Sequence, residues 1–166
     1  RMKSGRLLDA VNDLRDLPCR GSYLDVSCGR ADMLREAEHL GFSSVHGTEI
    51  VPSLIDGERV VRAEAHSLPF GDRSFAVVSL FDVIEHLLQG DDDAACRELH
   101  RVAQRHILIT ANNRPSFNKA GDDLHINKRP YDQWDERFRE WLPGCSVTWM
   151  KNNRNYISES WRIDLP

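Results

Sequence analysis

The stretch from Tyr23 to Asp32 constrains the fold of this 166-residue chain more than any other. It begins with an apolar run that predicts a buried strand, and the run breaks at the small residues Ser27, Cys28 and Gly29. A helical pattern then starts at Asp32. A strand, a tight turn and a helix N-terminus together form the ligand-binding corner of an open α/β sheet. We therefore expect this turn to contact a ligand.

Hydrophobic periodicity predicts alternating strands and helices along most of the chain. Such alternation is typical of a parallel sheet with helices on both faces, so we expect one α/β domain over residues 1–166, a three-layer αβα sandwich. The last two strands are close enough in sequence to pair as an antiparallel hairpin. The expected strands are 22–26, 44–50, 59–63, 74–81, 106–110, 146–150 and 157–163, the expected helices are 7–14, 31–40, 91–105 and 130–141, and the hairpin turn is 151–155.

Composition and charge exclude several classes of protein. With 40% hydrophobic and 29% charged residues the chain has the composition of a soluble globular domain, and its net charge of -4 gives no overall attraction to nucleic acid. No apolar run approaches the ~20 residues that a membrane span needs. The N-terminus lacks the apolar core of a signal peptide. The four cysteines show no CxxC spacing, so we expect reduced thiols in a cytoplasmic protein with no membrane partner.

The small-residue turn does not match the common phosphate-binding motifs. Dinucleotide binding requires G-x-G-x-x-G, but only Gly29 is present, and the Gly-Lys-Ser/Thr of a Walker A loop is absent. Asp25, at the end of the preceding strand, would repel a phosphate but would attract the α-ammonium group of S-adenosylmethionine. Glu49 follows about twenty residues after the turn, where nucleotide-binding folds place an acid on ribose hydroxyls. The positions of Asp25 and Glu49 therefore favour a ligand that combines a methionine group with a nucleoside.

Four segments carry a family resemblance in the same order. They are Leu24-Asp25-Val26-Ser27-Cys28-Gly29, Gly47-Thr48-Glu49-Ile50, Ala63-Glu64-Ala65-His66-Ser67-Leu68-Pro69-Phe70 and Phe81-Asp82-Val83-Ile84-Glu85-His86-Leu87. Together they resemble the class I (Rossmann-like) S-adenosylmethionine-dependent methyltransferases, in the small-domain group called type 11. The resemblance covers roughly residues 21–125. It implies a mostly parallel seven-stranded sheet with an antiparallel last strand, which the terminal hairpin fits.

The resemblance implies a role for each matching residue. Asp25, Cys28 and Gly29 would contact the methionine part of S-adenosylmethionine. Glu49 would bind the ribose hydroxyls, and Ile50 would lie against one face of the adenine. The family usually has glycine where Ser27 and Ala31 stand. Both residues are small enough to preserve the loop provided that neither requires a positive φ angle. The expected cofactor contacts are Asp25, Ser27, Cys28, Gly29, Glu49, Ile50, Glu64, Ala65, His66, Leu68, Phe81 and Asp82.

Two histidines are the candidate catalytic residues. Methyl transfer from a sulfonium is an in-line displacement that depends mainly on positioning, and a general base is needed only where the acceptor loses a proton. His86 follows the fourth strand, and His125 lies in the loop before the helix at 130–141. A purely structural role is the alternative for each. We expect a small-molecule acceptor, S-adenosylhomocysteine as the second product, and no metal.

Two alternatives remain open. The set Asp82, Glu85, His86 and His125 resembles the metal-binding constellation of small-RNA 3′-terminal 2′-O-methyltransferases, and mixed carboxylate and imidazole ligands bind divalent cations. RNA would then be the acceptor. The second alternative is a domain that binds S-adenosylmethionine without catalysis, because the loop lacks the family's usual glycines.

Two clusters of charged residues could have either a structural role at the surface or a role in binding. The three acids Asp91–Asp93 precede a helix and are expected to be solvated capping residues rather than a metal site. Arg114, Lys119, Lys128 and Arg129 surround the acceptor loop. They are expected to form a solvated face, although they would also favour an anionic acceptor.

Overall fold

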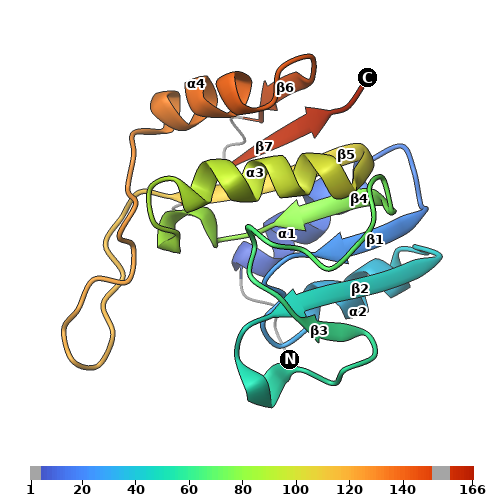
Figure 1. The fold of residues 1–166 in the computed structure, drawn as a ribbon, viewed down its shortest axis with the longest axis horizontal. Coiled ribbons are helices and arrows are strands. Elements are labelled where there is room, and N and C mark those ends of the chain that lie inside the picture. Colours follow the sequence, from blue (N-terminus) through green and yellow to red (C-terminus); the bar gives the residue numbers. More distant parts are fainter. Residues whose placement is uncertain (1–4, 151–157) are drawn as a thin grey trace.

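The computed structural model describes residues 5–150 and 158–166, which form a seven-stranded sheet and its covering helices (Figure 1). The strands are β1 (Ser22–Asp25), β2 (Ser44–Glu49), β3 (Val60–Arg62), β4 (Phe75–Leu80), β5 (Ala103–Asn112), β6 (Ser146–Trp149) and β7 (Ser158–Asp164). The helices are α1 (Gly5–Arg15), α2 (Asp32–His39), α3 (Asp91–Val102) and α4 (Tyr131–Trp141), with short 3₁₀ turns η1 (Pro52–Leu54) and η2 (Ile84–His86).

The sheet has the order β3-β2-β1-β4-β5-β7-β6. Strands β1 to β5 pair in parallel, whereas β7 runs antiparallel to both of its neighbours, β5 and β6. This arrangement confirms the predicted mostly parallel sheet with an antiparallel end. The predicted hairpin turn at 151–155 lies outside the described residues. Strand β7 inserts between β5 and β6, so the last two strands form the far edge of the sheet.

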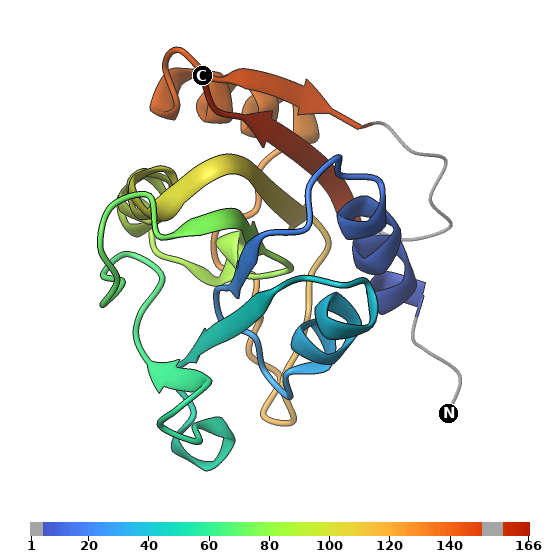
Figure 2. The same ribbon diagram turned by 90° about the vertical axis from the view of Figure 1, so that its right-hand side faces the viewer.

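Helices cover both faces of the sheet, which confirms the three-layer architecture (Figure 2). One core lies under α1 and α2, and the other lies under α3 and α4, where Trp134, Phe138 and Trp161 are fully buried. All six residues of β4 are buried, as expected for a strand covered on both faces. The aromatic residues of α4 therefore serve mainly as core.

The boundary between α3 and β5 differs from the prediction. The helix ends at Val102 and the strand begins at once at Ala103, so Arg105 belongs to β5 and not to the last helical turn. Strand β5 pairs with β4 on one side and with β7 along seven residue pairs on the other. These ladder hydrogen bonds replace those of a final helical turn. Local periodicity carries no information about such distant pairing.

Buried Asp92 anchors the loop between β5 and α4. It is 1% exposed and accepts hydrogen bonds from the Arg129 guanidinium and the Asn127 amide at 2.7 Å each. It also accepts one from the amide of Gly90, the residue before α3, at 2.9 Å. Arg129 stacks over the Trp134 ring at 5.1 Å. The expectation of solvated residues was therefore wrong for Asp92 and for Arg129, since the loop folds over both.

The topology leaves a crevice at the carboxyl end of the sheet. From neighbouring β1 and β4 the chain continues outward in opposite directions, to β2 and β3 on one side and to β5 on the other. Ligands of open α/β sheets bind at such a switch point, outside the carboxyl ends of the strands. The turn after β1 and the 3₁₀ turn after β4 both lie at this edge.

Candidate functional site

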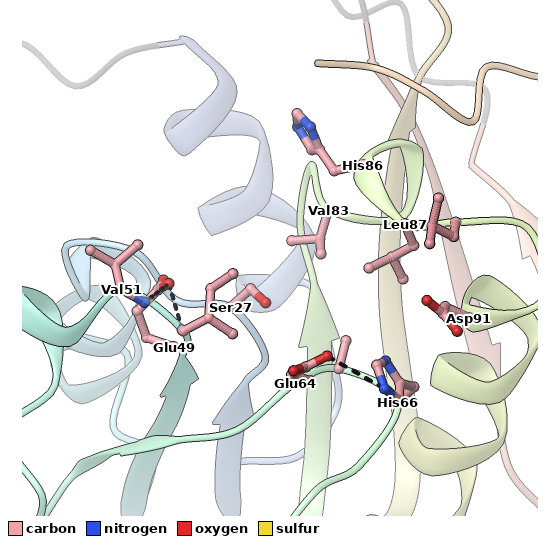
Figure 3. A pocket seen from close by; sticks show the side chains of 12 residues that line it. Ser27, Glu49, Val51, Glu64, His66, Val83, His86, Leu87 and Asp91 are labelled. Atoms are coloured by element: carbon pink, nitrogen blue, oxygen red, sulfur yellow. Dashed lines mark hydrogen bonds and ion pairs between the residues drawn. The ribbon is translucent and has the colours of Figure 1, made fainter.

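A cavity of about 370 Å³ opens at this edge (Figure 3). Its size falls within the range of small-molecule and cofactor pockets. Figure 3 shows Ser27, Glu49 and Val51 on one side and Leu87 and Asp91 on the other. The complete lining is Ser27, Glu49, Ile50, Val51, Glu64, Ala65, His66, Val83, His86, Leu87, Leu88 and Asp91.

Half of the expected cofactor residues line this cavity. They come from the turn after β1, the end of β2 and the turn after β3, three segments that the sheet brings together. The expected adenine loop is a tight turn in which the Ser67 amide donates to the Glu64 carbonyl at 3.0 Å. The lining residues among those predicted are Ser27, Glu49, Ile50, Glu64, Ala65 and His66, and the candidate catalytic His86 joins them.

The turn after β1 adopts left-handed backbone conformations at three alternate positions. The φ angles are 59° at Ser27, 54° at Gly29 and 58° at Ala31. The condition under which Ser27 and Ala31 would preserve the loop, that neither requires a positive φ angle, is therefore not met. A residue with a Cβ in this region costs roughly 1–2 kcal/mol, which explains why a glycine-rich loop would be the unstrained solution.

Hydrogen bonds to β2 hold the turn in this conformation. The Ser27 and Cys28 amides donate to the side chain and carbonyl of Thr48 at 3.2 and 2.8 Å, and the Gly29 amide donates to the Glu49 carboxylate at 2.8 Å. These three N–H groups therefore point at β2. They are not available to a phosphate, in agreement with the missing glycine fingerprint.

Gly47 in β2 allows the turn to approach this closely. A Cβ placed there would lie 2.6 Å from the Cys28 Sγ, far inside van der Waals contact. Burial raises the pKa of the Cys28 thiol to about 12. Cys28 is thus a neutral packing residue against β2, and neither it nor Gly29 lines the cavity.

Glu49 combines a structural contact with an open position at the cavity wall. Its Oε1 accepts from the amides of Ile50 and Val51 at 2.7 and 3.0 Å, while Oε2 accepts from Gly29. A carboxylate offers about four acceptor sites. The three donors therefore leave roughly one acceptor site of the carboxylate for a hydroxyl group of a ligand. The Glu49 side chain is 6% exposed and lines the cavity.

Asp25 lies beneath the turn and does not line the cavity. It is 4% exposed and accepts a 2.6 Å hydrogen bond from Ser79, whose hydroxyl also pairs with the Tyr23 hydroxyl at 2.6 Å. Burial raises the pKa of Asp25 to about 7, although the hydrogen bonds from Ser79 and Tyr23 act in the opposite direction and the charge of Glu49 adds to the rise. This carboxyl group titrates near neutral pH.

The remaining expected cofactor residues lie away from the cavity wall. Leu68 is buried in the core, with its amide bonded to the Glu98 carboxylate, and Phe81 packs against the core under α1 and α2. Asp82 has a φ of 54°, and its carboxylate accepts from Thr110 and Ser158 at 3.1 and 3.0 Å. It is therefore directed toward β5 and β7.

Several lining residues were missed by the sequence interpretation. They are mainly apolar, and two of them are unusually exposed: Leu88 at 63% and Val51 at 43%. For Val51 and Val83, the signal that could have identified them is an apolar residue within three positions of the end of a strand. The missed lining residues are Val51, Val83, Leu87, Leu88 and Asp91.

The two candidate catalytic histidines lie together although they are distant in sequence. Their rings contact edge to face with centroids 4.6 Å apart. His86 Nδ1 bonds the Leu124 carbonyl at 2.9 Å, and His125 Nδ1 bonds the Arg114 carbonyl at 2.5 Å. Partial burial lowers the pKa of His86. The buried Glu85 carboxylate completes a group whose potential ligand atoms lie within 4.8 Å of one another.

The basic residues of the acceptor loop do not form one patch. Arg129 is half-buried and pairs with Asp92, and Lys128 pairs with Asp123. Arg114 and Lys119 are exposed. In the part of the chain that the structure describes, no helix combines the length and the hydrophobicity that crossing a membrane requires.

Comparisons with known proteins agree with this geometry. A family model described as a methyltransferase domain matches residues 24–107, half of the chain. A search of curated protein sequences finds no match.

Solved structures share the fold at low sequence identity. The PH0226 protein from Pyrococcus horikoshii OT3 has a TM-score of 0.76 at 16% identity, over 96% of this chain and 89% of that one. An S-adenosylmethionine-dependent methyltransferase from Aquifex aeolicus has 0.72 at 14%, over 95% and 89%. The methyltransferase domain of bacterial CtHen1-C has 0.72 at 16%, over 97% of each. The chain therefore belongs to the methyltransferase domain family and has the class I S-adenosylmethionine-dependent methyltransferase fold.

Proposed function

We propose that this chain transfers a methyl group from S-adenosylmethionine to a small-molecule acceptor. The observation that carries the proposal is the cavity at the switch point, which is lined by Glu49 from the end of β2 and by His86 from η2. When bound, S-adenosylmethionine supplies an electrophilic methyl group on sulfur, and S-adenosylhomocysteine is the product. The residues of the chain bind and orient the two reactants.

The residues at the cavity fit this cofactor better than a nucleotide that carries phosphate. The turn amides are engaged with β2, and the open acceptor site of Glu49 matches a ribose hydroxyl. Ile50, 54% exposed, offers an apolar face to a base, and the turn at Glu64 and Ala65 would hold its edge. Asp25 beneath the turn supplies a carboxylate near the place where an ammonium group would bind.

The acceptor side is defined by His86 and His125. A backbone carbonyl only accepts hydrogen bonds, so each neutral ring carries its proton on Nδ1 and leaves a lone pair on Nε2. His86 is one of the residues that line the cavity. Leu87 and Leu88 beside it would exclude water from the acceptor.

Calorimetry with S-adenosylmethionine tests the cofactor assignment. We expect one binding site, and Glu49→Ala should weaken the affinity at least tenfold because it removes the hydroxyl acceptor and the partner of the Gly29 amide. Exposed Glu58 is the matched control, and Glu58→Ala should leave the affinity unchanged. Absence of binding to the native chain would refute the proposal.

Turnover with labelled methyl donor then separates an enzyme from a non-catalytic binding domain. The acceptor panel contains small metabolites with hydroxyl, amine and carboxylate groups, and short RNAs. Methylation of a small molecule supports the proposal. Methylation of RNA alone would replace it with the RNA 3′-terminal alternative, and cofactor binding without any turnover would favour the non-catalytic domain.

A further inference from the structure

We infer that Phe117 contacts the acceptor and that the acceptor is an uncharged small molecule with an aromatic ring. The inference rests on the proposed function, since it names the substrate class of the same site. It begins from the large apolar side chains that the described residues expose. Six of these seven lie in the segments that follow β2, β4 and β5, and the seventh, Leu8, lies on α1. The six are Ile50, Val51, Leu88, Phe117, Leu124 and Ile126.

These exposed side chains gather at the carboxyl edge of the sheet. Single exposed apolar residues are common on protein surfaces, whereas several at one place mark a binding site. Ile50, Val51 and Leu88 line the candidate cavity, so the exposed apolar surface is continuous with it. The other three belong to the loop between β5 and α4. Figure 1 shows this loop at the left, beyond the edge at which the arrows of β2 and β4 end.

Phe117 is the most exposed of the six, at 66%. Within the part of the chain that the structure describes, it belongs to neither hydrophobic core. A large aromatic side chain that stays in water on folding gains no stability from burial. A role in binding therefore explains its exposure, and a role in the core does not.

The hairpin that carries Phe117, residues 116–124, is held by its own hydrogen bonds. Phe117 lies opposite Asp123 in an antiparallel bridge. Backbone hydrogen bonds of 2.7 and 3.0 Å flank this pair on its two sides. The Asn118 Oδ1 accepts from the amides of Ala120 and Asp122 at 2.8 and 2.9 Å, which closes the turn. A side chain held on such a frame loses little freedom when it binds a ligand.

The pair of Phe117 and Asp123 lies close to His86. Because its hydrogen bonds flank the pair rather than join it, the two side chains are near neighbours on one face of the hairpin. The next carbonyl, that of Leu124, bonds His86 Nδ1 at 2.9 Å. Burial lowers the pKa of His86, and the nearby charge of Asp123 acts in the opposite direction. Phe117 therefore lies beside a histidine that lines the cavity.

The surroundings of Phe117 favour an uncharged ring. The Asp123 carboxylate beside it pairs with Lys128, so its charge is already offset. Between β4 and α3 the cavity lining is apolar apart from His86, with Val83, Leu87 and Leu88. An aromatic ligand would bury apolar area here and would also stack on the Phe117 ring, offset or edge to face.

Binding of a fluorescent probe tests the site without turnover. The probe is N-phenyl-1-naphthylamine, an uncharged aromatic compound whose emission rises in apolar surroundings, and it is titrated with and without S-adenosylhomocysteine. We expect saturable binding in both cases, about fivefold weaker in Phe117→Ala and nearly native in Phe117→Trp, which keeps an aromatic ring. The matched control is Leu8→Ala, which removes an exposed apolar side chain of α1 and should leave the affinity unchanged. Circular dichroism checks folding.

A matched pair of competitors tests the aromatic class. The pair is 2-naphthol and its saturated counterpart decahydro-2-naphthol, which share a carbon skeleton and a hydroxyl group. We expect 2-naphthol to displace the probe at a roughly two- to tenfold lower concentration, because only its rings stack on Phe117. Phe117→Leu, which keeps an apolar side chain without a ring, should remove this difference. Equal displacement by the two compounds from the native chain overturns the aromatic class.

The outcomes separate this inference from the proposed function. Absent probe binding, or equal losses in Leu8→Ala and Phe117→Ala, overturns the inference even if S-adenosylmethionine binds. Displacement of the probe by S-adenosylhomocysteine also overturns it, because the probe would then occupy the cofactor position. Probe binding that depends on Phe117, together with failure of cofactor binding, overturns the proposed function instead. Sedimentation velocity covers the last outcome: a native dimer that Phe117→Ala dissociates would make this face an interface between copies and overturn the inference.

Discussion

Ala31 adopts a left-handed conformation at the start of α2 although it is not a glycine. We predict that Ala31→Gly raises the free energy of unfolding by roughly 0.5 kcal/mol, because the relief of strain exceeds the added flexibility of glycine in the unfolded chain. Ala94→Gly in the interior of α3 should lower it by about 1 kcal/mol. Urea denaturation measures both, and an Ala31→Gly protein less stable than the native chain would contradict the prediction.

Asp25 links stability to pH. Its folded pKa of about 7 lies above the usual value of 3.8, mainly because of burial. The folded state then binds more protons than the unfolded state between these two pH values. The contribution of Asp25 to the free energy of unfolding is therefore complete below about pH 4 and is lost as pH rises through 7. We predict that Asp25→Asn becomes more stable relative to the native chain as pH increases from 5 to 8.

Denaturation of both proteins across this range checks the prediction. The comparison removes the effect of other titrating groups, since they are common to the two chains. A difference in unfolding free energy that does not change with pH would show that Asp25 titrates normally.

At the scale of elements, Asp92 joins α3 to the loop that carries His125. Removing its carboxylate in Asp92→Ala leaves the Arg129 charge and the Asn127 amide without their partner in a largely buried place. We predict a loss of roughly 3 kcal/mol of stability and faster hydrogen exchange in residues 113–130. Asp93→Ala, which breaks the more exposed pair with Arg97, should cost less than about 1 kcal/mol. Equal effects of the two substitutions would contradict this linkage.

At the scale of the whole molecule, ligand binding should stabilise the folded state. At a concentration of 100 Kd, S-adenosylmethionine adds about 2.7 kcal/mol, which raises the Tm of a domain of this size by roughly 5–10 °C. NADH and ATP should give no shift, because the turn amides that would bind phosphate are engaged with β2. Differential scanning fluorimetry makes the comparison, and a shift with NADH but not with S-adenosylmethionine would contradict the cofactor assignment.

Much of this fold could be predicted from local pattern. The apolar run at Tyr23–Val26, the buried strand β4 and the helix at Trp134 each carry a periodicity that one window of sequence contains. The acid Glu49 at the cavity wall was also expected, because spacing along a strand–helix–strand unit is a local property. By contrast, the burial of Asp92 and the strand start at Ala103 depend on partners far along the chain.

The sequence by itself determined the class of fold, the edge of the sheet where the candidate cavity lies and the absence of a phosphate-binding loop, since these follow from periodicity and from residue types at short spacing. Only the tertiary structure decided that Ser27 and Ala31 have strained backbone conformations. It also decided that Glu85 and His86 lie close to His125, whereas the Asp82 carboxylate is bonded by residues of β5 and β7. Backbone angles and contacts between distant segments arise from the packing of the whole chain. No local window of sequence contains them.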